Sequence, residues 1–487
     1  MKKFVLLFAF GLFLISGCFV FSSCGGKNGG LTRYIISARY DDQSQALLCN
    51  ENVIYQNSSE NALSEVCFFL YANSFDQGQK SVPTSYLDKA YPNGQSFGNL
   101  EILGVGQDDG DLEYAVSENK NILTIFLTES LYPNEVVELC IDFQINLANI
   151  NHRLGYGKNA TNFGNFFPIV CVYEDGFVKN EFSPSGDPFF SESSNFEVNF
   201  SCPSEYVVAS SGKQECSTEE NGVKTIKIVG ENIRDFAIVV SKNFEVLQKQ
   251  ADGTMLSYFF YDDKNAEKHL KLVEDAFLTF SKNFCKYPYS QLSVVKTNFC
   301  FGGMEYPNLV MISDDLVDEQ MISYVTTHEI AHQWWYSLVG NNQFSESWID
   351  EGLTEFSTAF FFEKNPSYGL KYDEIISGAV EHYKKFVEIY SDILGEPVNQ
   401  TMTRNLKEFD TEPEYVCNIY TKGLLLFDAL RKSMNDFKFF RCLKNYVDEF
   451  KYKIVSKEDV IESFSKSSHR NLENFFNSWL DGRVIIK

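Results

Sequence analysis

Two histidines and a glutamate stand in the pattern H-E-x-x-H within residues 327–335 (THEIAHQWW). Side chains four positions apart on a helix lie one above the other, so His328 and His332 can present two imidazoles to one metal ion. Glu329 would then reach a water at the metal rather than the metal itself. Only six histidines occur in the chain, which argues against a coincidental spacing. The pattern therefore predicts a metal site that activates water.

A catalytic zinc ion usually has three protein ligands and one open position. Glu351 is the candidate third ligand, separated from His332 by positions 333 to 350, which is eighteen residues. Residues 340–342 (GNN) favour a turn that ends the first helix. A second helix is predicted to begin near Glu346, and it would return the Glu351 carboxylate to the two imidazoles.

This spacing of H-E-x-x-H and glutamate resembles the gluzincins, and within them the membrane-alanyl-aminopeptidase-like family of zinc metallopeptidases. Two further blocks strengthen the resemblance. Residues 301–307 (FGGMEYP) resemble the family's G-x-M-E-N exopeptidase motif, with Tyr306 in the place of the usual asparagine and Glu305 retained. Residues 415–423 (YVCNIYTKG) are similar to the family's Y-x-K-G block. The resemblance implies one zinc ion per chain.

The resemblance also implies roles for residues outside the metal triad. Tyr420 would donate a hydrogen bond to the oxyanion of the tetrahedral intermediate, where preorganised donors contribute most. Glu305 would pair with the free α-ammonium of a peptide and so fix the scissile bond one residue from the N-terminus. Gly302 and Gly303 would let the backbone lie alongside the peptide, and Met304 would border the first side-chain pocket. Relatives often add a second acid from the N-terminal domain, and the sequence does not identify it here.

Several of these residues have a plainer interpretation. Glu355 lies one helical turn beyond Glu351 and is a candidate to orient a metal ligand, but it could equally be a solvated charge on a helix face. Tyr420 could be a buried core tyrosine, and Gly302 with Gly303 could form an ordinary turn. The motif context favours the functional interpretation for the tyrosine and the glycines.

The first half of the chain, residues 31–247, is rich in short β-type segments. Residues 122–127 and 136–142 are partly alternating strand patterns on either side of a Pro-Asn turn. Further strands are expected at 196–200, 206–209 and 236–240. Short strands with frequent turns predict a sandwich or curved-sheet domain, and the saddle-like N-terminal β domain of the resembling family fits this pattern.

The second half, residues 248–487, reads as mainly helical. Residues 248–253 are polar and turn-rich, and we expect them to link the two domains. Apolar residues recur at helical spacing over 265–283, a short strand is expected at 292–296, and helices dominate after 375. The resemblance implies an α+β multidomain protein in which a thermolysin-like, largely helical catalytic domain with a small sheet follows the β domain. The large helical C-terminal domain of many relatives is expected to be absent.

Composition limits the classes of partner. The 487-residue chain is 44% hydrophobic and 15% aromatic, as in packed globular proteins, and its formal net charge is −24. We find no basic cluster, so nucleic acid is not an expected partner. Peptides with a free N-terminus are the expected substrates, and the oligomeric state stays open.

Residues 1–30 read as a leader and a Gly-rich tether. Two lysines precede an apolar run at 4–15 that is short for a membrane span, and the run ends before Cys18 in a segment that resembles a bacterial lipoprotein cleavage box. Cys24 follows a second possible box. An ordinary cleaved signal and an uncleaved anchor are the alternatives. We expect an exported protein, held at a bacterial cell surface by lipid on Cys18 or Cys24.

The other ten cysteines are scattered, without C-x-x-C or zinc-finger spacing. In a chain of this size such residues are more often buried thiols. Cys202 and Cys216 flank a possible hairpin and form the one disulfide that we expect.

Together these features predict a zinc-dependent aminopeptidase that removes N-terminal residues from peptides. Two alternatives stay open. One is a zinc endopeptidase without a strict requirement for a free N-terminus, and the other is a catalytically silent surface scaffold that binds peptides.

Overall fold

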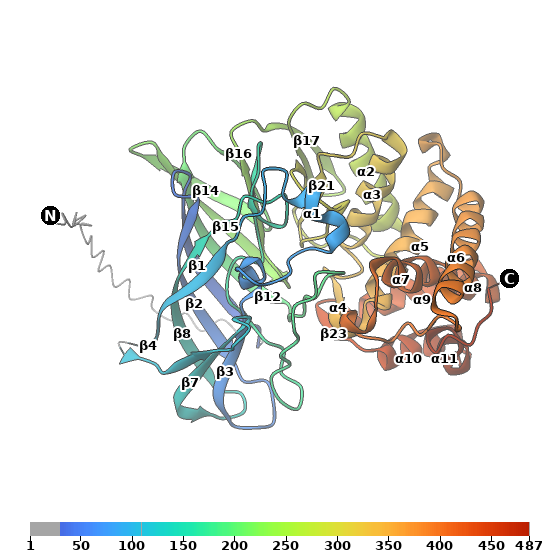
Figure 1. Cartoon of the computed structure of the whole chain (residues 1–487), viewed down its shortest axis with the longest axis horizontal. Helices are drawn as coiled ribbons and strands as arrows, with labels where there is room; N and C mark the ends of the chain where they lie inside the picture. Colours follow the sequence, from blue (N-terminus) through green and yellow to red (C-terminus); the bar gives the residue numbers. More distant parts are fainter. Residues whose placement is uncertain (1–29, 109, 487) are drawn as a thin grey trace, which may run out of the picture.

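The computed structural model describes residues 30–108 and 110–486. Figure 1 shows a β-rich N-terminal part beside a mainly helical C-terminal part, so the predicted α+β multidomain fold is confirmed. Within the described residues, no helix has the length and apolar character needed to cross a membrane. The leader, with Cys18 and Cys24, lies outside the described residues.

The N-terminal domain contains three sheets. The largest has eight strands in the order β14 (Lys213–Glu220), β15 (Val223–Ile233), β12 (Ser194–Pro203), β1 (Arg33–Asp41), β2 (Ala46–Gln56), β8 (Val136–Asn146), β4 (Asn99–Gln107) and β5 (Gly110–Asp111). One four-stranded sheet has the order β13 (Val207–Ser210), β16 (Ala237–Ser241), β10 (Thr161–Gly164) and β9 (Leu154–Tyr156). The other has the order β11 (Ile169–Val170), β3 (Leu63–Phe69), β7 (Ile122–Leu131) and β6 (Tyr114–Val116). The short helices η1 (Tyr71–Phe75), η2 (Thr84–Tyr86) and α1 (Leu87–Ala90) connect them.

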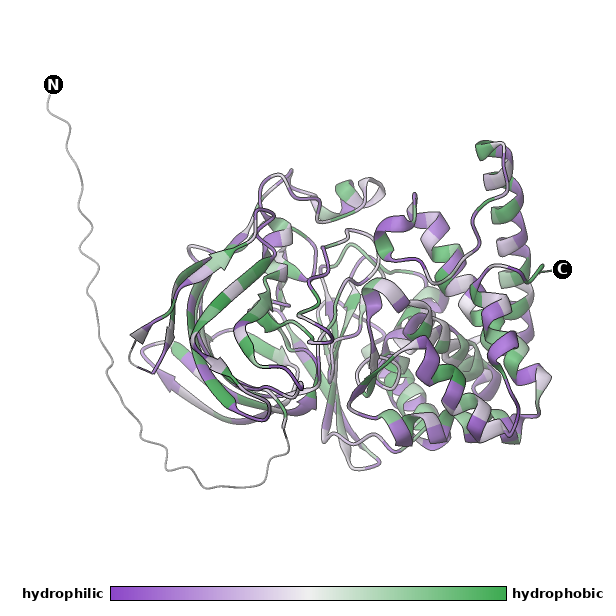
Figure 2. Cartoon of the chain, turned by 90° about the horizontal axis from the view of Figure 1, so that it is seen from below, coloured by the Kyte–Doolittle hydropathy of each residue, from purple (hydrophilic) through white to green (hydrophobic). Residues whose placement is uncertain are grey.

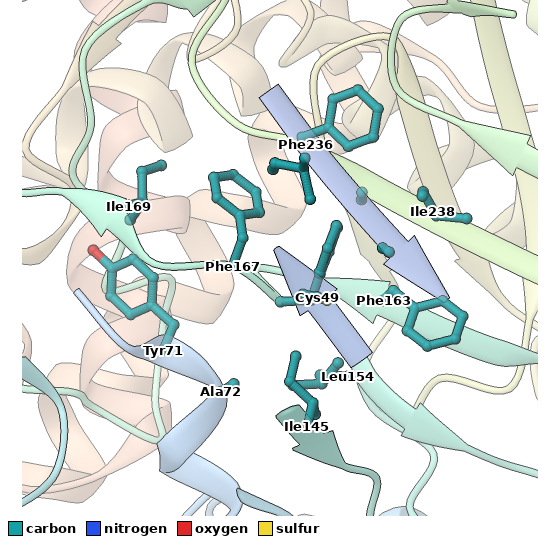
Figure 3. Packing of buried hydrophobic residues seen from close by; sticks show 14 of the residues in the cluster. Cys49, Tyr71, Ala72, Ile145, Leu154, Phe163, Phe167, Ile169, Phe236 and Ile238 are labelled. Carbon is teal, nitrogen blue, oxygen red and sulfur yellow. The ribbon is translucent and has the colours of Figure 1, made fainter. Parts of the chain in front are cut away.

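Alternating burial along the strands explains this layered arrangement. In β1 and β2 every second side chain is buried, as expected for strands with one face on a core. Figure 3 shows Phe163, Phe167 and Ile145, from different segments, gathered between the sheets. Strands β7 and β8 are consecutive in the chain but belong to different sheets, so the Pro-Asn turn between them crosses from one layer to the other.

The expected disulfide between Cys202 and Cys216 is wrong. Both cysteines are free, one buried and one exposed. Cys202 lies on β12 and Cys216 on β14, and β15 stands between these two strands. Strands are about 4.8 Å apart, so two cysteines separated by a whole strand exceed the reach of a disulfide, whose Cα atoms lie about 4.4–6.8 Å apart.

The C-terminal half begins with a five-stranded sheet in the order β17 (Glu245–Ala251), β18 (Thr254–Phe260), β19 (Gln291–Thr297), β21 (Leu309–Ser313) and β20 (Gly303–Met304). Residues 248–253 are therefore not a linker, because they form most of β17 and its tight turn into β18. The change of domain lies slightly earlier than residue 248, between β16 and β17. Polar side chains misled the sequence interpretation because β17 is an exposed edge strand.

Helices make up most of the remaining chain, and Figure 2 shows hydrophobic and hydrophilic residues interspersed along them. The α-helices are α2 (Ala266–Asn283), α3 (Glu319–Ala331), α4 (Gln343–Glu346), α5 (Trp348–Lys364), α6 (Tyr372–Leu394), α7 (Glu412–Val416), α8 (Lys422–Ser433), α9 (Asp436–Phe450), α10 (Lys457–Ser468) and α11 (Glu473–Leu480). Shorter elements are η3 (Pro366–Tyr368), η4 (Leu406–Glu408), the π-helical turn η5 (Cys417–Thr421), and the parallel strand pair β22 (Val339–Asn341) and β23 (Lys453–Val455). Helix α5 is buried on every side from Trp348 to Phe362, which places it in the centre of the domain.

The first metal-site helix ends earlier than expected. Helix α3 stops at Ala331, and His332 is its C-cap. A loop then leads to β22, so residues 340–342 lie beyond the helix rather than ending it. Arg234 of the N-terminal domain gives the reason, because its Nε donates to the carbonyl of Tyr336 at 2.6 Å. A Cβ on Gly340 would lie 2.2 Å from the Arg234 guanidinium carbon, so only glycine fits there.

Candidate active site

Three polar side chains from α3 and α5 converge at the centre of the catalytic half. His328 Nε2 lies 3.1 Å from His332 Nε2. Glu351 Oε2 lies 3.3 Å from the first of these atoms and 3.4 Å from the second. Ligand atoms about 2.0–2.1 Å from a tetrahedral zinc ion are separated by about 3.3 Å. Two imidazoles and a carboxylate at this spacing are therefore a donor set that fits zinc.

Each imidazole also has a partner on its other nitrogen. His328 Nδ1 lies 2.9 Å from Glu355 Oε1, and the hydroxyl of Tyr324 donates to the other oxygen of this carboxylate. His332 Nδ1 lies 2.9 Å from the carbonyl oxygen of Trp335. Such partners fix the ring orientation of metal-binding histidines. Glu355 is buried, so it is not a solvated charge on a helix face.

Burial and the two imidazoles give the carboxyl groups of Glu351 and Glu329 different pKa values. Burial opposes ionisation of Glu351, but His332 and His328 outweigh it and lower its pKa to about 2. Burial raises the pKa of Glu329 to about 8, although His328 opposes this shift. Glu351 between the two rings is therefore a much stronger acid than Glu329.

Tyr420 reaches the same centre from η5. Its hydroxyl donates to Glu351 Oε1 at 2.6 Å, and its ring stacks on that of His328 with a centroid separation of 6.0 Å. Tyr415 packs edge-on against Tyr420 from the preceding helix. The tyrosine of the downstream block is thus beside the triad rather than in the core.

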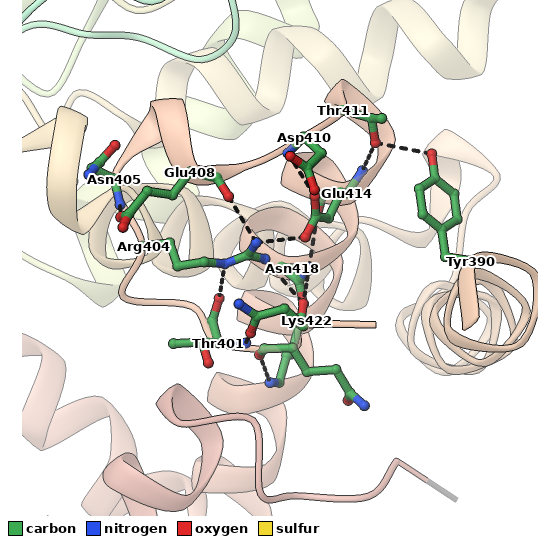
Figure 4. Close-up of polar contacts among 12 residues, drawn as sticks. Tyr390, Thr401, Arg404, Asn405, Glu408, Asp410, Thr411, Glu414, Asn418 and Lys422 are labelled. Carbon is green, nitrogen blue, oxygen red and sulfur yellow. Dashed lines mark hydrogen bonds and ion pairs between the residues drawn. The ribbon is translucent and has the colours of Figure 1, made fainter. Parts of the chain in front are cut away.

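A polar cluster holds the turn that carries Tyr420 (Figure 4). Arg404 Nη1 donates to Glu414 Oε1 at 2.6 Å, just before η5. Lys422, buried just after η5, donates from Nζ to the carbonyl of Gln400 at 2.6 Å. Both ends of the turn are fixed, so the hydroxyl of Tyr420 has a defined position.

Comparison with known proteins identifies this arrangement. The model of the peptidase family M1 domain matches residues 264–479. The C-terminal half of the chain therefore contains a domain similar to peptidase family M1.

The individual relatives of the chain are distant. It is 28% identical to aminopeptidase B of Rattus norvegicus over 231 residues, which are 44% of this chain and 34% of that protein. It is 22% identical to endoplasmic reticulum aminopeptidase 2 of Bos taurus over 76% of this chain and 41% of that protein. The chain thus spans about a third of the length of the aminopeptidase B relatives it matches.

Solved structures share the fold of the chain. An M1 zinc metallopeptidase from Deinococcus radiodurans superposes with a TM-score of 0.66 over 94% of this chain and 95% of that one, at 15% identity. A mutant of the Deinococcus enzyme is described as bound to a Tyr-ser-ala substrate, with a TM-score of 0.65, 15% identity, and the same coverage. Both domains are therefore arranged as in a known M1 fold.

Strand β20 presents the upstream motif to the triad. A Cβ on Gly303 would lie 2.5 Å from the carboxyl group of Glu329, so a side chain at this position would displace the glutamate. Glu305 is buried nearby, and burial together with Asp187 raises its pKa to about 7. The structure thus brings Glu305 and Gly303 into one cleft with Glu329.

Met304 does not border the cleft as expected. Its side chain is buried in the hydrophobic core, and it is absent from the described residues that line the cleft. Neighbouring side chains on an extended strand point to opposite faces, so Met304 faces away from the side that Gly303 and Glu305 present. Phe301 lines the cleft instead.

Tyr306, which replaces the usual asparagine of the motif, ties β20 to the N-terminal domain. Its buried hydroxyl donates to Asn165 Oδ1. A Cβ on Gly164 would lie 2.1 Å from this hydroxyl, so the tyrosine requires glycine opposite it. The larger aromatic residue therefore fills space at the domain interface and leaves Glu305 free to face the cleft.

The cleft has a volume of about 320 Å³ and lies between the two domains. Sequence reasoning missed the contribution of the N-terminal domain. Asp187 and Arg153 line the cleft, and Arg153 Nη1 donates to Asp187 Oδ1 at 2.9 Å. Both lie in loop or short-strand segments far upstream of every motif. Arg153 begins a segment, residues 153–156, that lies where relatives of the resembling family carry a similar block, but the match is weak, and no local signal singles out Asp187.

Proposed function

We propose that this protein is a zinc-dependent aminopeptidase that removes N-terminal residues from peptides. The observation that carries the proposal is the placement of Glu305, an acid outside the His328–His332–Glu351 triad, in the same cleft as the triad. A metal triad alone would serve an endopeptidase equally well. The aminopeptidase names of the curated relatives and the peptide bound to the Deinococcus enzyme support this assignment.

His328, His332 and Glu351 would hold the zinc ion. When bound, zinc polarises the scissile carbonyl and makes a water molecule more acidic. Glu355 and the carbonyl of Trp335 would keep the two rings oriented through the nitrogens that do not face the metal.

Glu329 would act as general base and then as general acid. It lies on α3 next to His328, and its carboxyl group faces the Gly303 backbone that lines the cleft. From there it takes a proton from the attacking water and delivers it to the leaving amine. Tyr420, whose hydroxyl now donates to Glu351, would turn this hydroxyl to the oxyanion that develops on the scissile carbonyl.

Two acids would recognise the substrate's α-ammonium group. Glu305 Oε1 accepts a hydrogen bond from Gln343, and the Glu305 side chain lines the cleft. Asp187 Oδ1 accepts from Arg153, and its second oxygen lies in the same cleft. An ammonium group has three N–H donors, so one carboxylate leaves donors for a second. We assign Asp187 as the second acid, contributed by the N-terminal domain.

The glycines of the upstream motif would receive the peptide backbone. Gly302 and Gly303 line the cleft beside Glu329. Without side chains there, an extended peptide can lie against β20 at hydrogen-bonding distance. Phe301 is near enough to contact the first side chain of the substrate.

Arylamides of free-amine amino acids, assayed with and without a chelator, test the proposal. We expect chelator-sensitive cleavage that zinc restores, and little cleavage of the N-acetylated forms. Equal cleavage of internal bonds in an N-acetylated peptide would favour a zinc endopeptidase. Bound zinc without any cleavage would favour a silent peptide-binding scaffold.

We also propose that the leader directs export and that lipid on Cys18 or Cys24 holds the protein at a bacterial cell surface. The support is the order of charged start, apolar run, small residues and cysteine in residues 1–30. Mass spectrometry of the mature N-terminus tests this. We expect a lipid-modified cysteine as first residue, and Cys18→Ala or Cys24→Ala should show which one. An unmodified mature N-terminus would contradict lipidation.

A further inference from the structure

A buried glutamine bridges the two sides of the cleft. Gln343, at the first position of α4, is 1% exposed. Its Nε2 donates to Glu305 Oε1 at 3.0 Å and to Asp350 Oδ2 at 2.8 Å. The two protons of this amide nitrogen are therefore donated to two different carboxyl groups.

The bridge connects the amine side of the cleft to the metal-binding helix. Asp350 directly precedes the metal ligand Glu351 at the start of α5. Its other oxygen, Oδ1, accepts from Asn341 Nδ2 at 2.9 Å, so the Asp350 carboxyl group is held from two sides. A hydrogen bond from Gln343 to this fixed group defines where Glu305 can lie relative to α5.

Without the hydrogen bonds of Gln343, the carboxyl groups of Glu305 and Asp350 would repel each other. Single ligand atoms of Glu305, Asp350 and His332 all lie within 4.8 Å of one another. Two carboxyl groups this close inside a protein repel each other when both are ionised. The geometry is not that of a second cation site, because an amide donor already stands between the two carboxyl groups and uses one oxygen of each. The amide offsets the repulsion and keeps Glu305 in place.

We propose that Gln343 is the positioning residue for amine recognition, fixing the Glu305 carboxylate at a set separation from the metal ligands. This inference rests on the proposed aminopeptidase function. In an N-terminal residue the α-ammonium and the scissile carbonyl are separated by a single Cα, so their binding groups must keep a matching separation. Misplacement by about 1 Å costs large factors in rate or affinity. Gln343 sets this separation without touching the substrate.

Gln343→Met tests the inference, because methionine has similar length and volume but no N–H donor. For free-amine aminoacyl arylamides we expect KM to rise about tenfold, as for loss of a hydrogen bond to a charged group, with a smaller change in kcat. Zinc content should stay at the wild-type level. Unchanged KM, or loss of zinc in parallel with activity, would overturn the inference.

Asn342→Ala is the matched control. Asn342 caps α4 through its side chain but contacts neither carboxyl group of the bridge. We expect it to lower the melting temperature at least as much as Gln343→Met while KM stays within about twofold, since a lost N-cap costs only stability. A tenfold rise in KM here would mean that any loosening of α4 reproduces the effect, and the inference would fail.

A double-mutant cycle with Glu305→Ala distinguishes an effect of Gln343 on the position of Glu305 from a general disturbance of the cleft. If Gln343 acts through Glu305, then adding Gln343→Met to Glu305→Ala should leave KM unchanged, because the two effects are not additive. A further tenfold rise in the double variant would overturn the inference. Wild-type protein without chelator-sensitive cleavage would instead overturn the proposed function on which the inference rests.

Discussion

The metal side and the amine side of the cleft differ in how far apart in the chain their residues lie. The metal side takes its ligands from α3 and α5, which follow each other closely in the chain. The amine side collects Glu305 from the segment just after β20, Asp187 from a loop of the N-terminal domain, and Gln343 from α4. The first is a local supersecondary unit, whereas the second exists only when both domains pack together.

This difference separates two properties of the proposed enzyme. The metal side determines whether a peptide bond is hydrolysed, and the amine side determines which bond reaches the metal. Substitutions on the metal side should therefore lower kcat or metal affinity. Substitutions on the amine side should raise KM and erase the preference for a free amine.

The largest effect is expected from Glu329→Gln on the metal side. Removing a general acid–base group typically lowers kcat by about 10²- to 10⁴-fold, while zinc stays bound because Glu329 is not a ligand. Steady-state kinetics with zinc analysis of the same sample measures both quantities. Near wild-type kcat in this variant would contradict the proposed mechanism.

Tyr420→Phe should follow, with kcat about 10²- to 10³-fold lower because one oxyanion donor is lost. KM should change little, since the hydroxyl acts on a charge that develops during the reaction. Tyr415→Phe is the control on the neighbouring ring, which packs against Phe409 and Tyr420 and is kept in this variant. Equal losses in kcat for the two variants would show that ring packing, not the hydroxyl of Tyr420, is what matters.

Glu355→Gln probes the metal side without replacing one of the three metal ligands. Loss of a carboxylate partner of a metal-binding histidine typically lowers metal affinity about 10- to 100-fold. Competition with a fluorescent zinc chelator measures this directly, and excess zinc should restore most of the activity. Unchanged zinc affinity would mean that Glu355 only packs against Tyr324 and His328.

The same contrast explains what could be predicted from the sequence. The metal triad follows from helical spacing and a short turn, and the structure places His328, His332 and Glu351 within contact of one another. The β-rich and helical halves follow from strand and helix periodicity. The position of the third ligand was found although the helix ends were misplaced, because β22 and Arg234 reshape the loop without moving α5.

The amine side depends on contacts that no periodicity encodes. Asp187 comes to Glu305 through the packing of two domains, and Gln343 was overlooked because a polar residue in a turn-rich segment is ordinarily solvated. Met304 was assigned to the cleft by its place in a motif, although strand alternation turns it into the core. The prediction of a disulfide between Cys202 and Cys216 was wrong because the sequence does not show which strands pair.

The smallest and most discriminating effect is expected on the amine side, from Asp187→Asn. The amide keeps the size of the side chain and an acceptor for Arg153 but removes the negative charge that would face the ammonium group. We expect KM for free-amine substrates to rise about tenfold, as for loss of a charge-assisted hydrogen bond, while slow cleavage of an N-acetylated peptide is unchanged. Asp187 also pairs with buried Arg153, so both variants should lower stability. Asp187→Asn should lower it less than Asp187→Ala, because the amide oxygen still accepts from Arg153. If both peptides were slowed equally by Asp187→Asn, the aspartate would be a structural partner of Arg153, and the amine side would consist of Glu305 alone.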